Sequence, residues 1–216
     1  IFAAVCNRFA PAGAKPDIER NGARIIFQSF QPLDPADSNG DADIYVYRHG
    51  AGPTADVYRI SLSNTGAQLA SPTGFDWPAI TPSGNFVAFS GSASGVIGAS
   101  SGKQLYRRQF GRLAHSSLVR VTVSPSGAVG AGGLGTDPLV PVLSETGRFV
   151  TFSSTMTNLI APNFSSGPRL FSCDLQAASS ALRRCFVAGT AQMTPSSGFT
   201  HTIVQGGSRH ALACPN

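Results

Sequence analysis

The sequence predicts an all-β protein built from repeated four-stranded units, and three observations carry this prediction. Gly (24) and Pro (15) are abundant among the 216 residues, there are 14 Phe, and only 12% of residues are charged. This composition favours many short strands joined by turns. A glycine-centred motif recurs at intervals of about sixty residues. Apolar and polar residues alternate with a period of two after each glycine, and no stretch has sustained helical periodicity.

The recurring motif places a glycine turn before a strand. It is written ERNGARIIFQS, TPSGNFVAFSG and SETGRFVTFSS, and its glycines are Gly22, Gly84 and Gly147, with a fainter copy at Gly207. The intervals are 62, 63 and 60 residues. The spacing extends to the flanking residues, with Phe27, Phe89, Phe152 and Leu212 five places after the glycine and Pro16, Pro78 and Pro141 six places before it. Fixed spacing of this kind identifies an internal repeat.

Each repeat predicts four strands, because two further alternating segments follow the motif. DIYVYRHG, KQLYRRQFG and PRLFSCDLQ form the first set, and VYRISLSNTGAQL, LVRVTVSPSGAVG and the weaker LRRCFVAGTAQM form the second. Four-stranded units in tandem stack radially as the blades of a β-propeller. We therefore expect a small β-propeller of about four blades in a single domain, 1–216. Its repeats cover about 14–75, 76–138 and 139–198, and 1–13 with 199–216 form a composite closing blade.

The phrase GRFVTFSSTMTNLI, from Gly147 to Ile160, resembles the WD40-like or TolB-like (PD40-type) β-propeller repeats of bacterial secreted proteins. The resemblance covers about three repeats. It departs in the residue before the motif glycine, usually Asp and here Asn21, Ser83 or Thr146. The resemblance implies association with proteins or with the cell envelope rather than catalysis.

The ends of the sequence leave three ways to complete the ring. IFAAVCNRFA (Ile1–Ala10) has the pattern of a strand, and the residues after Gly207 supply two strands at most. The two segments could form one blade within the chain, or the chain could be a fragment of a larger propeller. In the third alternative the amino-terminal strand completes the blade of a neighbouring molecule, because an open strand edge invites strand addition. The chain would then be a subunit of an extracellular fibre.

Four cysteines predict two disulfides. They are Cys6, Cys173, Cys185 and Cys214, none in a C-x-x-C motif. The topology predicts the pairs Cys6–Cys214, across the ring closure, and Cys173–Cys185, within one blade, out of three possible connectivities. Disulfides indicate an oxidising compartment, so we expect a secreted protein, extracellular or periplasmic.

The segment LDPADSNGDADIYV predicts a calcium site. Asp37, Asn39, Asp41 and Asp43 alternate around Gly40, and Asp34 could add a further oxygen. Oxygen ligands at every second position around a glycine turn can surround a hard cation. The alternative is an ordinary hydrophilic turn, since Asp, Asn and Gly all favour turns. Ca²⁺ is the only cofactor that the sequence suggests.

Charge limits the classes of partner. The net charge is +5, but no run of Lys or Arg is longer than two residues, which gives no support for a nucleic-acid partner. No apolar run is long enough to span a membrane. We expect a protein partner or self-association, with an anionic polysaccharide as an alternative.

Catalysis is not expected, because no nucleophile, base and orienting acid converge in the sequence. A propeller hydrolase or lyase acting on a polysaccharide is the alternative, and it would require Asp76, Glu145 and His201 to face one channel. Trp77 is expected to pack between blades. Arg59, Arg120 and Arg184 recur on the predicted fourth strands and are expected to be structural. The predicted function is thus an exported, non-catalytic propeller that serves as a binding or structural scaffold.

Overall fold

The computed structural model describes most of the three repeats. The described residues are 15–49, 56–71, 74–92, 102–110, 118–134, 140–160, 167–175, 184–189, 200–205 and 208–213. They contain fourteen strands and no helix.

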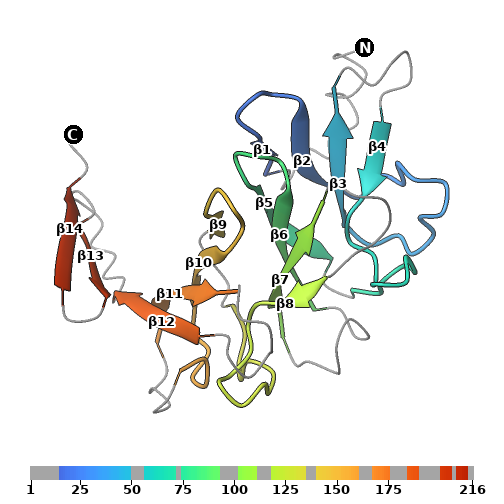
Figure 1. The fold of residues 1–216 in the computed structure, drawn as a ribbon. Helices are drawn as coiled ribbons and strands as arrows, with labels where there is room; N and C mark the ends of the chain where they lie inside the picture. Colours follow the sequence, from blue (N-terminus) through green and yellow to red (C-terminus); the bar gives the residue numbers. More distant parts are fainter. Residues whose placement is uncertain are drawn as a thin grey trace.

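Three antiparallel sheets of four strands follow one another along the chain (Figure 1). Sheet 1 contains β1 (Asp17–Ile18), β2 (Arg24–Ser29), β3 (Asp43–Arg48) and β4 (Asp56–Arg59). Sheet 2 contains β5 (Phe75–Ile80), β6 (Phe86–Gly91), β7 (Gln104–Gln109) and β8 (Val119–Arg120). Sheet 3 contains β9 (Val142–Leu143), β10 (Phe149–Ser154), β11 (Arg169–Asp174) and β12 (Arg184–Gly189). In each sheet the strands pair in sequence order, so the predicted four-stranded repeat of an all-β propeller is confirmed.

The fourth unit is a two-stranded hairpin. It pairs β13 (Thr200–Gln205) with β14 (Ser208–Ala213), and β13 lies against β12. The predicted completion of this blade by 1–13 lies outside the described residues. The choice between closure within the chain, closure between chains and a longer propeller therefore stays a prediction.

The repeated glycines form the same turn in all three sheets. Gly22, Gly84 and Gly147 have φ values of 70°, 70° and 65°, in the left-handed region that glycine tolerates best. Each donates its N–H to the carbonyl three residues before it, on Glu19, Thr81 and Ser144 respectively. The repeat noticed in the sequence is thus the turn that joins the first strand of each sheet to the second.

Apolar side chains pack between consecutive sheets. Phe75, Phe89 and Tyr106 of sheet 2 share one core with Ile26, Ile44 and Val46 of sheet 1. Ala88 and Leu105 of sheet 2 share a second core with Val150, Phe152 and Phe171 of sheet 3. Sheet 2 therefore contributes to both cores, as the middle blade of a radial stack does.

The three recurring prolines mark the free edge of the first strands. Pro16, Pro78 and Pro141 occupy the same position of the repeat, and all three line one groove. Proline has no N–H to offer to another strand, so it protects an open sheet edge from strand addition.

Candidate functional site

The first strands of the three sheets and the residues next to them line one groove, which we call the axial groove. Its volume is about 580 Å³. It is lined by Lys15, Pro16, Asp17, Ile18, Arg20, Pro78, Ala79, Ile80, Pro82, Val140, Pro141, Val142 and Leu143. Each sheet contributes at the same position of its repeat, so the tandem sequence builds the groove directly.

Exposed apolar side chains concentrate in the axial groove. Ile18, Val140 and Val142 are 55%, 41% and 64% exposed. Among the described residues only Phe30 and Tyr58 are other large apolar side chains exposed to this degree, and neither lines the groove. An exposed apolar patch inside a groove is typical of a binding site.

Charged groups at the groove are mostly committed to internal contacts. Arg20 and Glu145 form an exposed ion pair of 2.7 Å, and the Asp17 carboxylate accepts from the backbone N–H groups of Ile18 and Ile80, each at 2.9 Å. Lys15 makes no ion pair with the described residues, and its Nζ lies over the Trp77 ring, 2.7 Å from the ring centroid. Lys15 is thus the cation of this groove best placed to meet an incoming carboxylate.

Trp77 stands in an irregular part of β5. It has a φ of 54°, and the pairing of β5 with β6 shifts register between Asp76 and Ala79. Trp77 lines a narrow space between sheets 2 and 3 with Leu105 and Phe152, so it packs between blades as the sequence predicts. A positive φ is strained for a bulky residue.

The acidic loop between β2 and β3 is organised around Arg59 of β4. The Arg59 guanidinium lies 3.2 Å from carboxylate oxygens of both Asp34 and Asp37, and 3.9 Å from Asp43. The Arg59 side chain is buried, as are those of Asp37 and Asp43. The Tyr45 hydroxyl also donates to Asp37, and the Ser61 hydroxyl donates to Asp43.

The other two predicted calcium ligands face a different segment. Asn39 donates its side-chain amide to the Leu69 carbonyl at 3.2 Å, and the Asp41 carboxylate accepts from the Ser71 N–H at 3.2 Å. Three of the five predicted ligands therefore lie around Arg59, and Asn39 and Asp41 hold the loop to 69–71, with Asn39 also bonded to Asp43.

This arrangement does not fit a calcium ion. A calcium site needs six or more oxygens directed at one point, whereas a guanidinium already occupies the place where three of these carboxylates converge. No group of three or more acidic, His or Cys side chains in the described part of the chain is arranged to hold a metal. Calcium binding at Asp34, Asp37, Asn39, Asp41 and Asp43 stays a prediction, without support from the geometry.

Burial changes proton affinities in this loop. It raises the pKa of the Asp43 carboxyl to about 6, and the negative charge of Asp37 adds to the rise. Burial and the hydrogen bond to Asp37 also raise the pKa of the Tyr45 phenol above its ordinary value. Both groups thus keep their protons to higher pH in the folded state than in the unfolded chain, and Asp43 is still mostly ionised at pH 7.

Arg107 and Arg108 tie sheet 2 to both of its neighbours, a role that the sequence did not reveal. Arg107 donates to the Gly147 carbonyl of sheet 3 at 2.7 Å. Arg108 is buried and donates to the carbonyls of Leu62 and Ser63, which follow sheet 1. Burial lowers the pKa of Arg108 to about 10, so it remains charged at neutral pH. An alternating strand with two consecutive arginines was the available signal, since one of the two must face inward.

The described residues do not assemble the acid–base set of the alternative enzymatic hypothesis. Asp76 is near Lys103, with 3.4 Å between the charged atoms, at the start of β5. Glu145 pairs with Arg20 in the turn that follows β9, at the other end of the first strands. The side chain of His201, like that of Arg184, lies outside the described residues.

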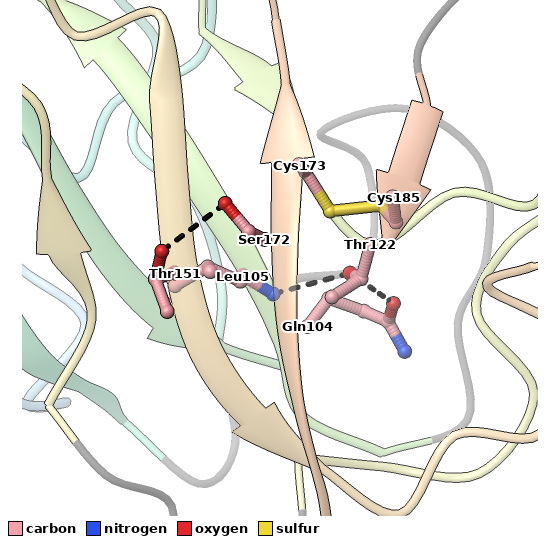
Figure 2. Close-up of a disulfide and its surroundings, with 7 residues drawn as sticks. All are labelled: Gln104, Leu105, Thr122, Thr151, Ser172, Cys173 and Cys185. Carbon is pink, nitrogen blue, oxygen red and sulfur yellow. Dashed lines mark hydrogen bonds between the residues drawn. A yellow bond between two sulfur atoms is a disulfide. The ribbon is translucent and has the colours of Figure 1, made fainter. Parts of the chain in front are cut away.

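A disulfide joins the third and fourth strands of sheet 3 (Figure 2). Its cysteines, Cys173 and Cys185, face each other directly in the pairing of β11 with β12. Figure 2 also shows Thr122, two residues after β8, whose hydroxyl donates to Gln104 at 2.6 Å and accepts from the Leu105 N–H at 3.2 Å. The predicted pair Cys6–Cys214 lies outside the described residues.

Comparison with known proteins gives structural likenesses only. No protein-family model matches the sequence, and no curated protein matches it. TolB from Acinetobacter baumannii matches this chain with a TM-score of 0.46 and 16% sequence identity over 92% of its residues. A structure from Agrobacterium tumefaciens assigned to TolB matches with a TM-score of 0.46 and 18% sequence identity over 82% of this chain. An acylaminoacyl peptidase from Pyrococcus horikoshii has a TM-score of 0.44 and 10% identity over 93% of this chain.

The chain spans 39% and 50% of the lengths of the two TolB structures and 32% of the peptidase. Such identities and TM-scores are too low to transfer an activity or a partner. None of the described residues forms a helix that could cross a membrane. The all-β architecture of the chain is given by its own four-stranded sheets.

Proposed function

We propose that this chain is an exported, non-catalytic β-propeller that binds a protein segment in the axial groove. The concentration of exposed aliphatic side chains in that groove carries the proposal, with Ile18 on β1 and Val140 and Val142 at β9. Burying them against a partner removes apolar surface from water, which stabilises a complex by about 25 cal/mol per Å².

The chemistry of the groove favours an apolar segment with a negative charge at one end. Lys15 lies at the groove without an ion-pair partner among the described residues. Each first strand has a proline within it or immediately before it, which disfavours binding by strand addition. The partner would therefore be held through its side chains rather than through its backbone.

An oxidising location supports the exported part of the proposal. The disulfide between Cys173 and Cys185 lies inside a sheet and connects two buried residues. Disulfides of this structural kind persist in extracellular and periplasmic compartments.

Selection of phage-displayed random peptides tests the proposed function. We expect the chain to enrich apolar peptides that carry an acidic residue. Binding should fall at least roughly tenfold in Val142→Asp, because the new carboxylate would lie in the contact and cost about 1.4 kcal/mol or more. Phe30→Asp is the matched control, since Phe30 is 53% exposed but lies outside the groove. Peptides that bind Val142→Asp and the native chain equally would contradict the proposal.

A further inference from the structure

The acidic loop contains its own cation, and this observation leads beyond the binding function. The carboxylates of three residues, Asp34, Asp37 and Asp43, lie near the Arg59 guanidinium. The oxygens of Asp34 and Asp37 are each 3.2 Å from a guanidinium nitrogen. Asp37 and Asp43 are almost completely removed from solvent, with exposures of 5% and 0%. Buried like charges cannot remain together without a compensating positive charge.

Arg59 occupies a position that recurs in the repeat. The same position of sheet 2 is Arg120, which is also buried and lies over the Tyr106 ring at 6.0 Å. Arg59 and Tyr45 pair across β4 and β3 as Arg120 and Tyr106 pair across β8 and β7. The arginine is thus part of the common sheet, whereas the acidic residues belong to sheet 1 only.

We propose that Arg59 is a built-in counter-ion that takes the place of a calcium ion in the acidic loop. Three carboxylates share one guanidinium, so the cluster is held in its folded geometry without a metal. Removing the guanidinium would leave the carboxylates of Asp34, Asp37 and Asp43 without their counter-ion, next to the hydroxyls of Tyr45 and Ser61. Calcium is the cation that such an all-oxygen set accepts.

Calcium titration of the folded native chain and of Arg59→Gln tests this inference, with calorimetry and thermal melting as readouts. Native protein should show no binding heat and no shift of its melting temperature up to about 1 mM Ca²⁺. Arg59→Gln should melt roughly 10 °C lower in the presence of a chelator, as expected for a broken buried ion pair in a chain of this size. It should regain part of that loss with calcium, with a dissociation constant of roughly 10⁻⁴ M. Terbium luminescence, excited through the neighbouring Tyr45, gives a second readout of the same site.

The equivalent arginine of sheet 2 provides the matched control. Arg120→Gln removes a buried arginine from the same position of a repeat whose loop sequence, GVIGASSGKQ, has no acidic residue. It should lose stability without acquiring calcium binding. If Arg59→Gln does not fold, the double variant Arg59→Gln/Asp43→Asn has one buried charge fewer and is titrated in its place.

Two results would overturn the inference. Calcium that stabilises the native chain would show that the loop needs a metal although Arg59 is present. An Arg59→Gln chain, or the double variant, that binds calcium no better than Arg120→Gln would show that the carboxylates do not converge on a vacated cation position.

Discussion

At the scale of single residues, the motif glycine combines two requirements that differ between sheets. A positive φ is common to Gly22, Gly84 and Gly147. The room for a side chain differs between these glycines. An added Cβ on Gly147 would lie 2.4 Å from the Phe86 ring, whereas one on Gly22 would be 3.8 Å from its nearest neighbour, an atom of Ile18. The glycine of a later sheet is therefore also a contact with the sheet before it.

The substitutions Gly22→Ala and Gly147→Ala separate these two requirements. Gly22→Ala should cost about 1–2 kcal/mol, because only the left-handed backbone conformation is penalised. Gly147→Ala should cost roughly 1–3 kcal/mol more, since the Phe86 ring must also move. Urea unfolding of both variants measures the difference. Equal losses would show that the contact between Gly147 and Phe86 is not important for stability.

Asp43 makes stability depend on pH. Its pKa is about 6 in the folded chain and near 4 when unfolded, so between these values the folded state binds the proton more strongly. The contribution of this group to the free energy of unfolding is therefore greatest below pH 4 and decreases as pH rises through 6, by on the order of 3 kcal/mol. Sheet 2 has the neutral Gln104 at the same position, bonded to Thr122 as Asp43 is to Ser61.

The variant Asp43→Asn should flatten this pH dependence between about pH 4.5 and 7. Unfolding free energies measured across that interval check the expectation. Asp41→Asn is a suitable control, because the Asp41 carboxylate contacts the Ser71 N–H outside the Arg59 cluster. A slope that is identical in the native chain and in Asp43→Asn would rule out Asp43 as its source.

At the scale of strands and sheets, sheet 3 links its third strand to its fourth by a different kind of bond from the one that sheets 1 and 2 use. Sheets 1 and 2 use a hydroxyl two residues beyond the fourth strand, on Ser61 and Thr122, to bond the first residue of the third strand. Sheet 3 uses the covalent bond between Cys173 and Cys185. The outer strand of a blade has one neighbour only, so such a tie compensates for the missing second one.

The disulfide of sheet 3 should therefore contribute measurably to stability. Its loop spans a sequence separation of 12 residues, for which chain entropy predicts about 3 kcal/mol. We expect Cys173→Ala/Cys185→Ala to lose roughly this amount in urea unfolding, with β12 showing faster amide exchange than β10. If the double variant were as stable as the native chain, β12 would be held by packing alone.

At the scale of the whole molecule, the sheets are linked by both apolar cores and buried arginines. Sheet 2 shares one core with sheet 1 and another with sheet 3, and Arg108 and Arg107 reach toward the same two neighbours. The stacking of the sheets creates the axial groove. It places Ile18 and Val142 in one groove, although their strands are more than a hundred residues apart in the sequence. The peptide selection with Val142→Asp and Phe30→Asp is therefore a test at this scale.

The sequence by itself determined the repeated unit of this protein. Glycine turns, alternating strands and the prolines before them follow local rules of φ, ψ and side-chain alternation, so Gly22, Gly84, Gly147 and their following strands could be predicted without coordinates. The pair Cys173–Cys185 was also accessible, because two adjacent strands of one hairpin bring both residues together.

Only the tertiary structure decided which charges meet and which apolar side chains remain exposed. The alternation of Asp37, Asn39, Asp41 and Asp43 around a glycine suggested a metal, and the sequence places no Lys or Arg among these acids. Strand pairing brings Arg59 from a later strand to these acids. The exposure of Val142 likewise depends on how the three sheets come together around the groove. Electrostatic pairing and solvent exposure depend on distances through space, and a repeat pattern along the chain does not fix those distances.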